Sequence, residues 1–303
     1  MTPVAEATGV ALHTGIEAHV RLRAALPGSG IRFVRTDLPG SPSIPAVITN
    51  VTPERRSTAL MDRSTGVSVR TVEHFLATCF ALGVKDCVLE VDGPELPAGD
   101  GAALYWVELI RQAGLAEAQT DADAAAAGHT AADQSLRVVD VWRDAPKVSE
   151  PILIEDEEGQ SGAFVAAFPA DEFHADFVFV PPYPGQAVQI VEYAGGSGRN
   201  EAGFFVHCLA PARTPAFLEE IAALREAGLG RGVSQEQVCL LSAGGPVGEW
   251  RFPDEPARHK LVDLLGDLFL AGRFRARVVA VRTGHRHNAL LARRVWEMCH
   301  ERR

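Results

Sequence analysis

The sequence has no apolar run of the roughly 18 residues that a membrane-spanning helix needs. Its N-terminus also lacks the basic segment and apolar stretch of a signal peptide. Basic residues are in deficit, with 29 Lys and Arg against 39 Asp and Glu, which excludes a protein held on nucleic acid by a general positive field. The five cysteines form no C-x-x-C pair and mostly stand in apolar runs, which is typical of reduced thiols in a cytoplasmic protein.

Apolar residues are plentiful, at 47% of the 303 positions, so the chain can bury a large core without disulfides or a structural metal. This length predicts two domains or one large one. An Ala/Asp-rich stretch over 116–135 lacks a sustained apolar stripe and is interpreted as a linker. We therefore expect an N-terminal domain over 1–115 and a C-terminal domain over 136–303.

Periodicity predicts strands and helices in both parts. In the front part, strands are expected at 18–23, 31–35 and 87–91, shorter extended pieces at 45–50 and 57–61, and helices from Thr71 and over 102–113. In the back part, strands are expected at 136–142, 163–168, 173–180, 187–193, 203–209 and 276–282, with helices over 214–228 and 254–270 and from about 287. The helix at 214–228 is expected to have Thr214 as its N-cap and Pro215 as its first residue. Strands followed by helices within each half favour an α+β fold of two-layer sandwiches over a doubly wound sheet.

The long helix over 254–270 carries a polar face with metal-binding potential. His259, Asp263 and Asp267 fall on one side at helical spacing, while leucines fill the other. A histidine and an aspartate four residues apart project from successive turns and can share one ion. A helix surface with a hydrogen-bonded histidine is the alternative. Other histidines, among them His13, have no partner at such spacing and are expected to be structural or solvated.

Two further clusters carry potential chemistry. Glu73 and His74 open a helix, where His74 could be a third metal ligand and Glu73 could hold a water; an ordinary first turn favouring an acid is the alternative. His285 lies between a strand and a helix, where a polar loop is the alternative. Together the three clusters offer three ligands, a base, an acid and an orienting carboxylate, which zinc-assisted hydrolysis requires.

The motifs that contain these residues extend along nearly the whole chain. They are ATGVALHTG (7–15), RSTAL (56–60), TVEHFLA (71–77), LEVDGPELPAGDGAA (89–103), ARTPAF (212–217), RHKLVDLLGDLFLAG (258–272) and TGHRHN (283–288). In this order and spacing, the chain resembles the UDP-3-O-acyl-N-acetylglucosamine deacetylases, zinc amidohydrolases of lipid A synthesis. The resemblance implies two similar α+β halves packed helix layer to helix layer, with the metal between them. It also implies a small βαβ insert at about 215–253 that forms an acyl-chain tunnel.

By position, the resemblance implies that His74, His259 and Asp263 bind Zn²⁺. Glu73 matches the general base of the family. His285 matches the electrostatic or acid residue.

The same resemblance identifies Asp267 as the carboxylate that orients the acid histidine. Thr214 matches the threonine near the reacting oxygen. Lys260 and Arg282 match basic positions on the diphosphate side. The implied partner is an acylated UDP-sugar, with no nucleic acid and no membrane span; the oligomeric state is open, with a monomer favoured.

Three departures from the family pattern leave the substrate open. Pro215 stands where an aromatic residue is usual, residues 230–236 lack the usual turn, and Gly244-Gly245-Pro246 is expected to break strand pairing. One alternative is therefore a paralogous zinc N-deacetylase for a different acylated or nucleotide sugar. A non-catalytic ligand-binding relative is the second alternative; an intact base and acid beside the ion argue against it.

Overall fold

The computed structural model describes residues 4–52, 54, 56–116, 142, 144–156, 162–196, 201–232 and 234–300. Apart from Ala116, the linker expected over 116–135 lies outside these residues, as does the strand expected over 136–142 except for Trp142, which is in a turn. Among the described residues, no helix is long and apolar enough to cross a membrane.

The N-terminal half is built on a five-stranded sheet with the order β1-β2-β8-β3-β4. β8 lies at its centre, antiparallel to β2 and parallel to β3. The alternating pattern of β2 buries Ala18, Val20 and Leu22 on one face, as its sequence predicts. The strands are β1 (Val4–Val10), β2 (Glu17–Ala24), β3 (Ile31–Arg35), β4 (Ser43–Pro45) and β8 (Cys87–Val91).

The C-terminal half repeats this topology. Its sheet has the order β12-β11-β16-β10-β9, and the central β16 is parallel to β11 and antiparallel to β10. Read from β9 to β12, each strand occupies the place of its counterpart from β1 to β4. The strands are β9 (Ile152–Glu155), β10 (Phe164–Phe168), β11 (Phe173–Phe179), β12 (Gln189–Gly195) and β16 (Arg277–Val281). The expectation of two similar α+β halves is confirmed.

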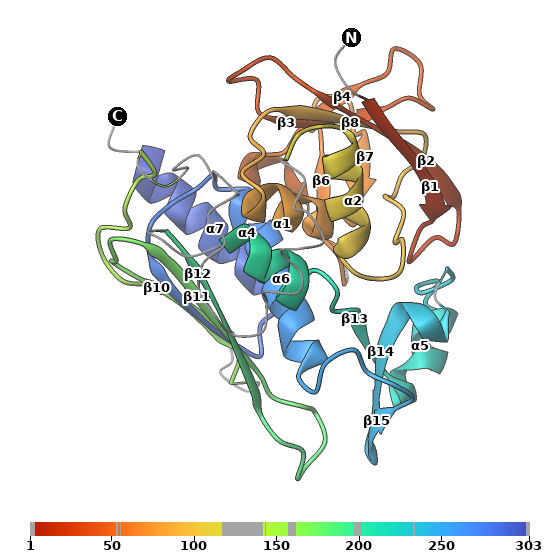
Figure 1. Ribbon diagram of the computed structural model, residues 1–303, viewed down its shortest axis with the longest axis vertical. Coiled ribbons are helices and arrows are strands. Elements are labelled where there is room, and N and C mark those ends of the chain that lie inside the picture. The colour runs from red at the N-terminus through yellow and green to blue at the C-terminus, as the bar shows by residue number, and fades with distance from the viewer. Residues whose placement is uncertain are drawn as a thin grey trace.

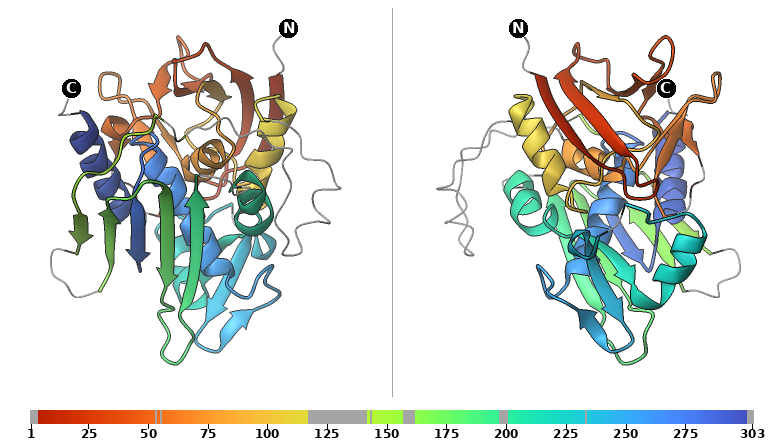
Figure 2. Two further views of the ribbon diagram at one scale, coloured as in Figure 1. Left: turned by 60° about the vertical axis from the view of Figure 1, so that its left-hand side comes forward. Right: turned by 90° about the vertical axis from the view of Figure 1, so that its right-hand side faces the viewer.

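Helices fill the space between the two sheets, as Figure 1 and the left view of Figure 2 show. In each half one helix precedes the central strand and one follows it: α1 (Glu73–Ala81) and α2 (Leu104–Gln112) around β8, α6 (Glu255–Phe269) and α7 (His285–His300) around β16. The sequence predicts one buried face for α6. The structure buries almost all of α6, because α1, α7 and the strands β11 and β12 pack around it.

Smaller elements flank these layers. A three-stranded sheet of β5 (Val51–Thr52), β6 (Ala59–Met61) and β7 (Ser68–Arg70) precedes α1. A 3₁₀ helix over Ile48–Asn50 replaces the end of the extended piece expected at 45–50. The strand expected at 203–209 is wrong, because the chain there is helical: α4 (Glu201–Phe204) continues into a π-helical turn, Phe205–Leu209, that contacts α6. A short apolar run of this kind does not distinguish a strand from a buried helix.

The insert is a βαβ unit, which corrects the helix expected to begin at Thr214. Thr214 starts β13 (Thr214–Phe217), which pairs in parallel with β14 (Val238–Ser242) after a 3₁₀ turn and α5 (Ile221–Glu226). The expectation that Gly244-Gly245-Pro246 breaks pairing is also wrong, since β15 (Gly245–Val247) pairs with β14. Pro215 and Pro246 both lie on edge strands of this sheet, where a missing N–H is tolerated.

The contact between α1 and α6 depends on the absence of a side chain at Gly266. A Cβ placed there would lie 2.0 Å from the carbonyl oxygen of Glu73. We expect Gly266→Ala to force the helices apart and to lower the free energy of unfolding by about 1–3 kcal/mol. Denaturant unfolding measures this effect. Gly93→Ala is the control, because its Cβ would meet only Ala18 at 3.7 Å; equal stability of the two variants would contradict the prediction.

Candidate active site

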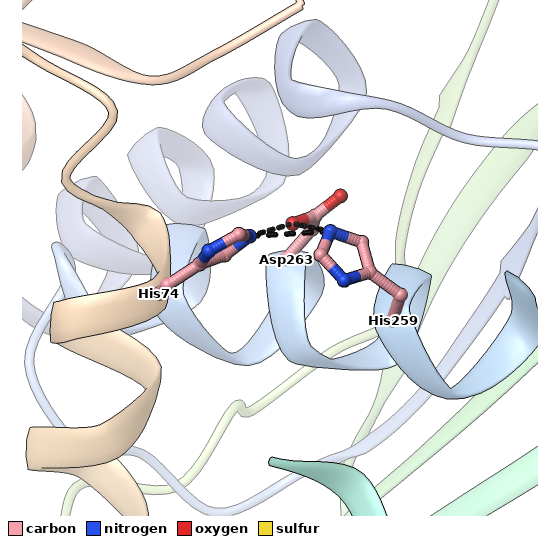
Figure 3. A group of neighbouring side chains, drawn as sticks. All are labelled: His74, His259 and Asp263. Atoms are coloured by element: carbon pink, nitrogen blue, oxygen red, sulfur yellow. Dashed lines mark hydrogen bonds and ion pairs between the residues drawn. The ribbon is translucent and has the colours of Figure 1, made fainter. Parts of the chain in front are cut away.

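Three side chains from the two halves converge at the α1–α6 contact. His74 Nε2 lies 3.1 Å from His259 Nε2, and Asp263 Oδ1 lies 3.3 Å from the first and 3.4 Å from the second of these atoms. Figure 3 shows the two rings and the carboxylate pointing toward one point. Among the described residues, this is the group of His, Cys, Asp and Glu side chains whose geometry fits a metal ion. The structure therefore brings together residues 185 positions apart.

Local structure explains why these atoms meet. His259 and Asp263 are separated by four residues on α6, so their side chains leave adjacent turns on the same face. His74 is the second residue of α1 and stands three residues after Thr71, whose φ of 58° makes a sharp turn at the end of β7. The backbone of Glu73 touches Gly266 on α6, which draws the first turn of α1 against the turn that follows Asp263.

The surroundings of this group suit a cation. His259 Nδ1 lies 3.0 Å from the carbonyl oxygen of Ala212, an acceptor that places the proton on Nδ1 and leaves the Nε2 lone pair free. Asp263 Oδ1 is buried and accepts no hydrogen bond. When both imidazoles carry their protons on Nδ1, three lone pairs face one another here, an arrangement that a positive ion would stabilise.

Electrostatics keep His74 and Asp263 in the forms that bind metal. Burial lowers the pKa of His74, which favours its neutral imidazole. Burial alone would raise the pKa of Asp263, but the charge of Lys260 and the contacts with both histidines hold this pKa well below its usual range. Lys260 Nζ donates to Asp263 Oδ2 at 2.8 Å. Asp263 is therefore ionised at neutral pH.

Glu73 lies beside the group and is buried, with 3% of its surface exposed. Its Oε2 accepts a hydrogen bond of 3.0 Å from the backbone N–H of Thr58. Burial raises the pKa of Glu73 to about 8, with the nearby carboxylates of Asp263 and Asp267 adding to the effect and His285 opposing it. This carboxyl group can consequently take up and release a proton near neutral pH.

His285 and Asp267 form a buried pair on the other side. His285 Nδ1 lies 2.9 Å from Asp267 Oδ2, which also accepts a 2.9 Å bond from Asn288 Nδ2. The hydroxyl of Thr58 donates to Asp267 Oδ1. Burial would lower the pKa of His285, but Asp267 raises it to about 9. His285 is therefore a cation that can donate a proton at neutral pH.

The remaining predicted residues divide between the cavity and the surface. Thr214 and Lys260 line a cavity of about 670 Å³ that also reaches His285. The Thr214 hydroxyl donates to the carbonyl oxygen of Gly101 at 3.1 Å. Arg282 follows β16 with a φ of 57°, is exposed, and is not among the residues that line this cavity.

The structure adds cavity residues that the sequence interpretation did not select. His13 lines the cavity with both ring nitrogens buried and, among the described residues, without a hydrogen-bond partner, so its interpretation as a merely structural or solvated histidine is incomplete. Arg56 lines the same cavity and pairs with Glu220 of the insert. Both stand in motifs of the resemblance, GVALHTG and RSTAL, and those motifs were the available signal.

Metal binding can be measured directly. We expect the purified chain to bind one divalent ion, and His74→Ala to weaken binding by more than the roughly 10–100-fold that loss of a ligand's hydrogen-bond partner costs. Equilibrium dialysis with metal analysis provides the measurement. His174→Ala is a suitable control, because this histidine is partly exposed on β11 beside Glu172. Equal binding by both variants would contradict the site.

The sequence is similar to known proteins over nearly its whole length. The model of the family described as "UDP-3-O-acyl N-acetylglycosamine deacetylase" matches residues 2–297. A UDP-3-O-acyl-N-acetylglucosamine deacetylase of Nostoc sp. is 38% identical over 291 residues, which are 95% of this chain and 94% of the relative. The enzyme of the same name from Chlamydia abortus is 34% identical over 295 residues, 96% of this chain and 94% of the relative. The chain therefore belongs to the UDP-3-O-acyl N-acetylglycosamine deacetylase family.

Proposed function

We propose that this protein is a zinc-dependent deacetylase that hydrolyses the N-acetyl group of UDP-3-O-acyl-N-acetylglucosamine in lipid A biosynthesis. The observation that carries the proposal is the convergence of His74, His259 and Asp263 between Glu73 on one side and the His285–Asp267 pair on the other. Relatives that carry this activity in their names align over nearly the whole chain.

The proposed metal ligands are His74, His259 and Asp263. Two neutral imidazoles and one carboxylate are a donor set typical of catalytic zinc, because they leave a net positive charge and an open position. When bound, zinc supplies a Lewis acid and lowers the pKa of the attacking water. The Oδ1 atom of Asp263, which is buried and accepts no hydrogen bond, supports this assignment.

Glu73 is the proposed general base. The N–H of Thr58 holds one carboxylate oxygen, so the other oxygen is available to remove a proton from the water that attacks the amide carbonyl. Burial around Glu73 excludes bulk water and raises its proton affinity, which suits a group that must accept a proton and then give it up.

His285 is the proposed acid. It carries a proton at neutral pH, and Asp267 fixes the orientation of the ring through Nδ1, so Nε2 can deliver a proton to the departing amine nitrogen. The positive charge of the ring also stabilises the oxyanion that develops on the carbonyl. Thr214 assists as a further donor to that oxygen once its hydroxyl hydrogen turns away from Gly101.

The cavity combines apolar and basic lining residues, as an acylated sugar nucleotide requires. The lining that the insert supplies is mainly apolar and suits an acyl chain; the side chains are Phe217, Ile221, Leu224, Leu229, Val238 and Leu240. Lys260 also lines the cavity and can attract an anionic group, while the proposed contact of Arg282 with the diphosphate requires substrate that extends beyond the cavity. Pro215 is buried in the cavity wall, so the cavity has no aromatic ring at that position.

A cytoplasmic location stays part of the proposal and is supported by the free cysteines.

Replacement of the base separates catalysis from binding. We expect Glu73→Gln to lower kcat for acetate release from UDP-3-O-acyl-N-acetylglucosamine by about 10²–10⁴-fold, since the amide keeps the bond from Thr58 but cannot accept a proton. Glu90→Gln on β8 is the matched control and should retain full activity. Wild-type protein that binds the substrate without releasing acetate would favour the non-catalytic alternative.

The orienting carboxylate gives a second test. Asp267 accepts from Thr58 and Asn288 and faces the His285 ring, so Asp267→Asn places an amide NH₂ among donors and removes the charge that keeps His285 protonated. We expect a loss of kcat on the order of 10²–10⁴ with the zinc content unchanged. Acetate-release kinetics and metal analysis on one preparation provide both values. Full activity in this variant would exclude His285 as the acid.

A further inference from the structure

Three consecutive residues, Ala212, Arg213 and Thr214, connect the metal group to the insert. The carbonyl of Ala212 is the partner of His259 Nδ1. Thr214 begins β13 and lies in the cavity wall, held to Gly101 through its backbone N–H as well as its hydroxyl. Arg213, between them, does not line the cavity.

Arg213 is 8% exposed, and all three nitrogens of its guanidinium group donate hydrogen bonds. Its Nε lies 2.8 Å from Glu255 Oε1 and its Nη2 lies 3.2 Å from Oε2, while its own backbone N–H donates to Oε1 at 2.9 Å. The remaining donors reach two carbonyl oxygens of the insert, those of Glu236 at 3.2 Å and Glu249 at 2.8 Å. Glu255 is fully buried and also accepts from the N–H of Arg251.

Glu255 links the Arg213 segment to the helix that carries His259. Glu255 opens α6 and precedes His259 by four residues, so it lies one turn before that histidine on the same side of the helix. The ion pair therefore fixes residues 212–214 against the first turn of α6, directly before the turn that carries His259. A shift of this segment would move the acceptor of His259 Nδ1 and the Thr214 hydroxyl together.

We propose that Arg213 is a positioning residue: through Glu255 it holds the Ala212 carbonyl on His259 and the Thr214 hydroxyl in the cavity. It thereby sets the affinity for zinc and the rate of deacetylation without touching metal or substrate. The rate component rests on the proposed function, whereas the affinity component does not. Arginine is required because a lysine ammonium cannot bind a carboxylate in the two-pronged mode and reach two carbonyls at once.

Arg213→Lys tests the proposal. We expect zinc to bind about 10–100-fold more weakly, the range typical for loss of a partner that orients a histidine ligand. We also expect kcat to fall by a larger factor than KM rises. Zinc affinity is measured by competition with a chromophoric chelator, and kcat and KM by acetate release.

Arg258→Lys is the matched control on the same turn of α6. Arg258 pairs with Asp254 at 2.6 Å and donates to the Cys208 carbonyl at 2.7 Å, so it is also an arginine bound to a carboxylate and a backbone oxygen. Among the described residues, its hydrogen bonds and its ring contact are with Asp254, Cys208 and Phe252 and not with residues 212–214. This variant should keep the zinc affinity and kcat of the wild type.

An Arg213→Lys protein with a lower unfolding temperature but the zinc affinity of the control would overturn the proposal and leave Arg213 a purely structural role. If that variant does not fold, Glu255→Gln replaces it, because the amide oxygen can still accept from one of the two backbone N–H groups, that of Arg213 or that of Arg251, while the charge is lost. Weaker zinc binding by Glu255→Gln would support the proposal, and unchanged binding would reject it. A wild-type protein that binds zinc but releases no acetate would refute the proposed function alone.

Discussion

The close approach of α1 to α6 is the constraint on which the site depends. Gly266 lets the carbonyl of Glu73 rest directly on the backbone of α6, and this contact brings the first turn of one helix against the middle of the other. His74 then meets His259 and Asp263, and Glu73 reaches the space beside them. Without this approach, the three proposed ligands would not surround one point.

The repeated topology explains why the site forms between the halves. In each half, the helix before the central strand covers the inner face of the sheet, and these two helices, α1 and α6, pack against one another. Polar residues on such helices are surrounded by protein from both sides, so they are buried without being part of a purely apolar core. The insert closes the remaining side, because β13 follows directly from the segment that contacts His259.

The sequence predicts the parts of this arrangement that depend on local periodicity. The polar stripe of His259, Asp263 and Asp267 follows from helical spacing alone, and the α+β class follows from the order of elements. For residues that meet only through tertiary contacts, local sequence offers His74 as a possible ligand, and only the family motifs pair it with His259. Thr-Pro is typical of a helix N-terminus, but the strand that contains Thr214 is defined by pairing with Val238, which local sequence does not encode. The place of His13 in the cavity wall depends on tertiary contacts in the same way.

Two neighbouring acids at the site are driven in opposite directions by their surroundings. Asp263 lies beside Lys260 and two imidazoles, which keep it ionised. Burial and the nearby carboxylates of Asp263 and Asp267 instead raise the pKa of Glu73 to about 8, against the opposing charge of His285. When their surroundings separate the pKa values of two adjacent carboxyl groups, one stays an anion and the other can accept and release a proton. The anion suits a metal ligand, and the proton carrier suits a base. The proposed roles of Asp263 as a metal ligand and Glu73 as the base thus follow from the groups that pack around each of them.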